Sequence, residues 1–114
     1  MPGSDGLPGR GDIVRVPFPY TDGAARQHRP ALVIARSGPG PGFLLWVLMI
    51  TSAENRGWPG DIAIPDHIAA GLPAPSLVRT AKIATIEASR ADARGRLAGP
   101  ALAQIMTEIR ARIG

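Results

Sequence analysis

An uninterrupted apolar segment at residues 43–50, FLLWVLMI, constrains the fold more than any other feature of the sequence. The segment is too short to span a bilayer, and it has no polar face to turn toward water. It lies between the Gly- and Pro-rich residues 37–42 and the polar pair Thr51-Ser52, which favours a strand over a buried helix. We therefore expect a central strand covered on both sides, with Trp46 in the core.

Shorter strand patterns flank this segment. The partial alternation of residues 13–18 predicts a strand whose far end Pro17 confines to an edge or a bulge. Residues 76–86 carry apolar anchors for one or two strands. The other expected strands cover residues 31–35 and 61–65, and polar or Gly- and Pro-rich loops are expected at residues 19–28, 37–42 and 55–60.

The C-terminal segment has the clearest helical pattern. Pro100 suits the first helical position, where a missing N–H costs nothing. Helical spacing predicts one apolar stripe, formed by Leu102, Ile105, Met106, Ile109 and Ile113. Several short strands followed by one helix predict an α+β, mainly β fold of antiparallel strands. Residues 1–10 are expected to form a flexible lead-in, and residues 11–114 a single domain.

The charge balance is compatible with a partner that carries phosphates. Among 114 residues, 13 are Lys or Arg and 9 are Asp or Glu, which gives a formal charge of +4 and suits nucleic acid. All of the basic residues except Lys82 are Arg, however, and Gly and Pro are also abundant. Because G/C-rich codons encode these residues, the composition of the genome explains part of the bias equally well.

The residues that the chain lacks disfavour several classes of protein. Without cysteine there are no disulfides and no thiolate metal sites. The two histidines, His28 and His67, are too few for a zinc site built from protein ligands alone. No secretory signal or membrane-spanning segment is visible. We therefore expect a cytoplasmic protein, away from the membrane, that uses no metal or other cofactor.

Motifs in a fixed order give the sequence a resemblance to a known family. GDIV at residues 11–14 opens the first strand, HRPA at residues 28–31 opens the second, and ITS at residues 50–52 closes the central strand. With VRTAKI at residues 78–83 and the final helix, this order resembles the MazF/PemK-like toxins over about residues 11–113. The resemblance implies an SH3-like barrel, a homodimer, metal-independent cleavage of single-stranded RNA, and neutralisation by a cognate antitoxin.

The resemblance assigns the chemistry to Arg29 and Thr51. Attack by an RNA 2′-OH builds negative charge on the phosphate, and a guanidinium is a permanently charged, bidentate donor for that charge. The Thr51 hydroxyl, at the end of the most apolar strand, could orient the 2′-OH or bind a phosphate oxygen. Without the resemblance, Arg29 could simply pair with a carboxylate such as Asp12, and a β-branched residue at a strand end needs no function.

His28 and Arg79 are further candidates. His28 could transfer protons, because imidazole does so near neutral pH. Arg79 aligns with a basic residue that some family members use near the scissile phosphate, but it could also be an outward-facing strand residue. One branch of the family has a catalytic acid two positions later, where this chain has Ala81. The resemblance therefore implies a mechanism through Arg29 and Thr51, with His28 or water completing the proton transfers.

A second group of residues is expected to bind the RNA. Aromatic rings stack on unpaired bases, each contributing about 1–3 kcal/mol. Tyr20 and Trp58 lie in loops where they could do so, although each could equally cover a dimer or antitoxin surface. The Ser52 hydroxyl is a further candidate to donate a hydrogen bond to a phosphate. Arg79 and Lys82 are expected to contact the RNA as cations.

Two other functions stay open on the sequence. Some relatives on the same barrel are non-catalytic toxins that bind a protein such as DNA gyrase. The chain could also be an inactive relative, which the absence of an acid at Ala81 leaves open. The occurrence of Arg29 together with Thr51 favours the endoribonuclease.

Overall fold

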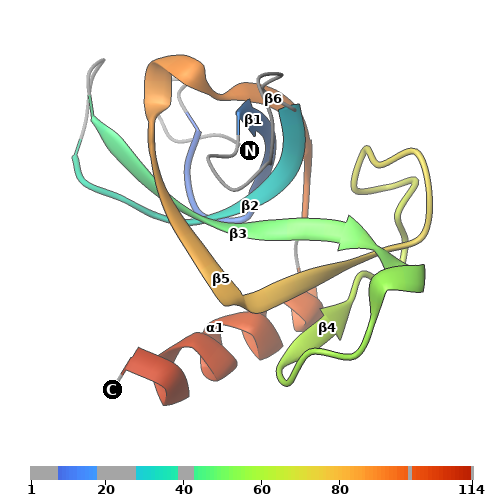
Figure 1. Cartoon of the computed structure of the whole chain (residues 1–114). Coiled ribbons are helices and arrows are strands. Elements are labelled where there is room, and N and C mark those ends of the chain that lie inside the picture. The colour runs from blue at the N-terminus through green and yellow to red at the C-terminus, as the bar shows by residue number, and fades with distance from the viewer. Residues whose placement is uncertain (1–7, 18–27, 39–42, 98, 114) are drawn as a thin grey trace, which may run out of the picture.

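The computed structural model describes residues 8–17, 28–38, 43–97 and 99–113, and it arranges six strands in one antiparallel sheet (Figure 1). The strands are β1 (Asp12–Pro17), β2 (His28–Arg36), β3 (Leu44–Ser52), β4 (Asp61–Ala63), β5 (Ser76–Glu87) and β6 (Asp92–Arg96). Their order across the sheet is β4-β5-β3-β2-β1-β6. Two 3-10 turns, η1 (Ala53–Asn55) and η2 (Ala88–Arg90), follow β3 and β5, and helix α1 (Gly99–Ile113) ends the chain. The expected mainly β, antiparallel α+β fold is confirmed.

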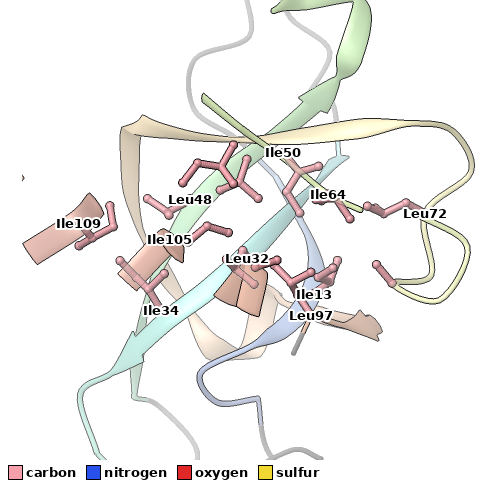
Figure 2. Packing of buried hydrophobic residues seen from close by; sticks show 14 residues of the cluster. Ile13, Leu32, Ile34, Leu48, Ile50, Ile64, Leu72, Leu97, Ile105 and Ile109 are labelled. Carbon is pink, nitrogen blue, oxygen red and sulfur yellow. The ribbon is translucent and has the colours of Figure 1, made fainter. Parts of the chain in front are cut away.

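An apolar core lies on each face of the curved sheet. Successive residues of a strand point to opposite faces, so β2 supplies Leu32 and Ile34 to one core and Ala31 and Val33 to the other. The first core is closed by α1, whose Ile105 and Ile109 lie near the β2 and β3 side chains (Figure 2). The second core also contains Val14, Val16, Leu45, Val47 and Ile86.

The predicted apolar stripe of α1 is confirmed except at its end. Ile105 and Ile109 are buried, and Leu102 and Met106 pack against the core. Ile113 is 69% exposed, so its place in the stripe was predicted wrongly. The sheet no longer covers that side of the helix in the last turn.

The prediction that Trp46 lies in the core is also wrong. Trp46 is 37% exposed, and Leu44 is similarly exposed. Leu45 and Val47, the neighbours of Trp46 in the strand, are buried. The first half of β3 therefore has one open face, because the core closed by α1 begins only at Leu48. An apolar sequence alone does not reveal which of two apolar faces has a partner.

The structure decides between one strand and two in residues 76–86, and it adds a strand that was not predicted. Residues 76–86 belong to one continuous strand, β5, whose pairing with β3 shifts opposite Leu48 and Met49. β6 was not predicted, because its side chains are mostly exposed and lack an apolar alternation. Backbone pairing with β1 alone identifies it.

The segment before β1 contacts the sheet within the described residues. The backbone N–H of Gly9 donates to Asp12 Oδ2 at 2.8 Å, and Arg10 Nε donates to the carbonyl of Ile34 at 3.1 Å. Of the predicted lead-in, residues 1–7 lie outside the described residues, as does Phe18 at the predicted end of the first strand. No helix in the described part of the chain is long and apolar enough to cross a membrane.

Candidate functional site at the end of β2 and β3

The strand register brings Arg29 and Thr51 to the same end of the sheet. β2 pairs with β3 through Val33↔Val47 and Ala31↔Met49. Continuing this antiparallel register by two residues puts Arg29 level with Thr51, on the sheet face that carries Ala31 and Met49. Arg29 also pairs with Val16 of β1. The printed β2–β3 pairs end at Ala31↔Met49, and the register extended beyond them aligns the two residues that the sequence singled out on one face.

The Thr51 side chain is buried and held by a hydrogen bond. Nδ2 of Asn55 donates to Thr51 Oγ1 at 3.0 Å. Asn55 ends the η1 turn that directly follows β3, so the local chain reversal brings its amide back over the strand end. Arg29 is half-buried, with its Nε inaccessible to water. Both groups thus lie on ordered backbone at the rim of the second core.

Arg79 is a buried residue of this site and not an outward-facing strand residue. Its Nε and Nη2 donate to the two carboxylate oxygens of Asp61 at 3.1 and 3.0 Å. Nη2 also donates to the backbone carbonyl of Asn55 at 2.6 Å. The register pairs Arg79 with Met49 on one side and Asp61 on the other. Arg79 is therefore joined through Asn55 to Thr51.

Trp58 lies over this ion pair and stays accessible. The Arg79 guanidinium carbon is 4.6 Å and Lys82 Nζ is 5.0 Å from the centroid of the Trp58 ring, within the range of cation–π attraction. The ring is exposed. Three residues expected to bind RNA, Arg79, Lys82 and Trp58, are thus brought together by the fold.

The loop that carries Trp58 is anchored by β5 and by the last turn of α1. Thr80 Oγ1 donates to the carbonyl of Gly60 at 2.8 Å, and Arg112 Nη2 donates to the carbonyl of Pro59 at 2.7 Å. Gly60 has φ +84°, and a Cβ there would overlap the Thr80 and Arg112 side chains. The glycine is therefore needed both for its backbone conformation and for close packing.

The surroundings of Asp61 favour its charged form. Burial by itself raises the pKa of Asp61, but hydrogen bonds from Arg79 and from the backbone N–H groups of Trp58 and Gly57, with the Arg79 charge, outweigh it. The pKa therefore lies below the ordinary value of 3.8. Neither Asp61 nor Asn55 belongs to a motif, and the pairing of Asp61 with Arg79 joins residues 18 positions apart, so no local pattern singles them out.

His28 lies on the other face of β2. It is adjacent to Arg29 in the strand, so the two side chains point to opposite faces. His28 is exposed and lines a cavity of about 350 Å³ together with Arg15, Arg94 and Leu72. Within the described chain, the structure does not bring His28 together with Arg29 and Thr51.

The remaining predicted residues have different positions. Ser52 pairs with Ser76 at the end of β3 and points to the face opposite Thr51. Tyr20 lies outside the described residues. Ala81 is exposed on β5, and the carboxylate nearest to Arg79 comes instead from Asp61 on the neighbouring strand. No group of three or more metal-binding side chains lies together in the described part of the chain.

Solved structures share this fold. MazF of Deinococcus radiodurans is 23% identical, with a TM-score of 0.71 over 96% of this chain and 99% of that chain. The MazF–MazE complex of the same organism is 21% identical, with a TM-score of 0.70 over 96% and 98%. An endoribonuclease solved with its cognate antitoxin from a mycobacterial species is 18% identical, with a TM-score of 0.70 over 94% and 95%. None of the curated protein sequences compared with the chain matches it.

The family match assigns this small, mainly β protein to the toxins of type II toxin–antitoxin systems. Residues 9–114 match the family described as PemK-like, MazF-like toxin of type II toxin-antitoxin system, and the chain belongs to this family. The resemblance inferred from the opening motifs is thereby confirmed over nearly the whole chain.

Proposed function

We propose that this toxin is a metal-independent endoribonuclease that cleaves single-stranded RNA. The observation that carries the proposal is the Thr51 hydroxyl held by Asn55 at 3.0 Å, at the end of the sheet where the β2–β3 register, extended from Ala31↔Met49, aligns Arg29 with Thr51. A permanent cation beside an oriented hydroxyl suits a reaction in which negative charge develops on a phosphate. Family membership supports the same class of reaction.

In the proposed reaction the ribose 2′-OH attacks the adjacent phosphorus, and the 5′-oxygen of the next nucleotide leaves. The products are a 2′,3′-cyclic phosphate and a 5′-OH end. Arg29 would donate to the non-bridging phosphate oxygens as their charge increases. Since Thr51 Oγ1 accepts from Asn55, its own hydrogen is left to donate to the substrate. A threonine hydroxyl is a weak base, so we assign it positioning and charge stabilisation.

The proton transfers are assigned to water. His28 has suitable chemistry, but its side chain is on the face of β2 opposite Arg29. His28→Ala should therefore still cleave RNA, with the same sequence preference as wild type and still without a metal. A loss of cleavage comparable to that of Arg29→Ala would return His28 to the reaction.

RNA binding is proposed to involve the accessible Trp58 ring and the neighbouring Lys82. The ring offers a surface for an unpaired base, and the cation suits a phosphate. Arg79 has Nε and Nη2 engaged by Asp61 and Asn55, so it would reach a phosphate only through Nη1. We retain Ser52 and Tyr20 as proposed RNA contacts on sequence grounds.

A cognate antitoxin and a second copy of the chain are the proposed protein partners. Two of the structurally similar proteins were solved as complexes with an antitoxin. Dimer formation is checked by the mass of the purified toxin in solution.

The test is incubation of antitoxin-free protein with mixed single-stranded RNA in excess EDTA, followed by mapping of the product ends. Cleavage with 2′,3′-cyclic phosphate ends should persist in EDTA and disappear in Arg29→Ala. Arg15→Ala is the matched control, because it removes the same charge from the exposed face of the neighbouring strand. Inhibition by EDTA would contradict the metal-free mechanism. No cleavage by folded wild type would favour a toxin that binds a protein such as DNA gyrase, or an inactive relative.

A further inference from the structure

The Asp61 carboxylate is the best-satisfied acid near the site. It accepts from Arg79 Nε and Nη2 at 3.1 and 3.0 Å and from the backbone N–H of Trp58 at 3.2 Å. The side chains of Asp61 and Arg79 are each only 9% exposed. A bidentate pair with this burial fixes the guanidinium in both position and plane.

The fixed guanidinium in turn holds the residue that orients Thr51. Arg79 Nη2 donates to the carbonyl of Asn55 at 2.6 Å, and Asn55 Nδ2 donates to Thr51 Oγ1 at 3.0 Å. Asn55 itself is exposed and lies in a single 3-10 turn. These two hydrogen bonds join Asn55 to the rest of the site.

We infer that Asp61 is a positioning residue that orients the Thr51 hydroxyl through Arg79 and Asn55. The inference rests on the proposed function, since Thr51 matters to a reaction only if the toxin cleaves RNA. Asp61 touches no substrate atom in this scheme.

The chemistry of the carboxylate makes the isosteric Asp61→Asn a sharp test. The two oxygens of Asp61 accept from Arg79 Nε, from Arg79 Nη2 and from the backbone N–H of Trp58. Asparagine offers one oxygen and one NH₂ group. At least one N–H of Arg79, or the backbone N–H of Trp58, must then face the NH₂ group, which is itself a donor. The shape is retained while the orientation of Arg79 is lost.

The primary measurement is kcat on a short RNA that wild type cleaves, together with the Kd for the same RNA carrying a 2′-deoxy group at the scissile position. Asp61→Asn should lower kcat by about 10²-fold, the size expected for a displacement of about 1 Å. The Kd for the uncleavable RNA should change much less. Asp12→Asn is the matched control, because it removes the other buried, arginine-paired carboxylate and should leave kcat unchanged.

Asn55→Ala is the second variant, and it should fold because Asn55 is exposed. It should lower kcat to a similar extent, and adding Asp61→Asn should cause little further loss, since both act on one hydroxyl. Wild-type kcat in folded Asn55→Ala, or equal loss of kcat in Asp12→Asn and Asp61→Asn, would overturn the inference.

A readout that does not depend on cleavage separates this inference from the proposed function. In ¹H–¹⁵N NMR spectra, the Arg79 Nε–H and the Asn55 side-chain amide should exchange with water faster in Asp61→Asn than in wild type. Asp12→Asn should leave both signals unchanged. If exchange is faster in Asp61→Asn but wild type cuts no RNA, the proposed function alone is refuted. Unchanged exchange of the Asn55 amide in Asp61→Asn would refute the relay, whether or not RNA is cut.

Discussion

Replacing Asp61 by Asn should destabilise the protein far more than the same change at Asp12. Both acids are paired with an arginine, at 3.0 Å in Asp61–Arg79 and at 2.8 Å in Asp12–Arg96. The arginines that would be left behind differ, because the Arg79 side chain is 9% exposed and the Arg96 side chain is 40% exposed. Arg96 can recover water when its partner is removed, whereas Arg79 cannot.

The burial of the remaining arginine sets the size of the effect. Removing one member of a buried pair costs about 3–5 kcal/mol, and because asparagine still accepts one hydrogen bond we expect about 3 kcal/mol for Asp61→Asn. For Asp12→Asn the half-exposed partner reduces the expected cost to about 1 kcal/mol. In a chain of this size each kcal/mol lowers Tm by roughly 4 °C. The expected losses in Tm are therefore about 12 °C for Asp61→Asn and about 4 °C for Asp12→Asn.

The pH dependence supplies a second, independent check. The folded-state pKa of Asp61 is lowered, because the Arg79 and backbone hydrogen bonds outweigh the effect of burial. A carboxylate of this kind contributes stability above its unfolded pKa and loses it as the pH falls through the folded value. The difference in free energy of unfolding between wild type and Asp61→Asn should thus be constant at neutral pH and shrink below about pH 4.

The assay is thermal and urea unfolding followed by circular dichroism, at one protein concentration and at neutral and acidic pH. Equal Tm losses in the Asp61 and Asp12 variants would show that the burial of the remaining arginine does not control the cost. A difference that stayed constant into strong acid would show that the Asp61 charge is not what stabilises the fold.

Two further predictions, each with a matched control, rest on the packing. Gly95→Ala should lower the free energy of unfolding by about 1–3 kcal/mol, because a Cβ at Gly95 would overlap the carbonyl oxygen of Ala70. Gly38→Ala is the control and should unfold like wild type, because a Cβ at Gly38 would have open space around it. Equal urea midpoints for the two variants would contradict this expectation. Ile109→Asp should unfold the chain by burying an unpaired charge, whereas Ile113→Asp, at an exposed position, should retain the wild-type far-UV spectrum and Tm. A folded Ile109→Asp would refute the assignment of the buried helix face.

Local patterns predicted most of the elements and the family. The alternation before Pro17 and the stripe around Ile105 and Ile109 each report burial along a single element, and such patterns are visible without knowing the partner. The apolar segment at residues 43–50 predicts its strand in the same way, but not the exposure of Leu44 and Trp46. Motifs in order along the chain likewise singled out Arg29 and Thr51. The strand and helix predictions succeed because the information lies in neighbouring residues, while the roles of Arg29 and Thr51 stay predictions.

Only the tertiary structure decided which side chains from different strands come into contact. The exposure of Trp46, the edge strand β6 and the pair Asp61–Arg79 all depend on register and on where the covering helix ends. Asp61 lies 18 residues from Arg79 in the chain, and no pattern in either strand specifies that they pair. A strand pattern shows which side chains share a face, but only pairing between strands brings the side chains of a site within hydrogen-bonding distance.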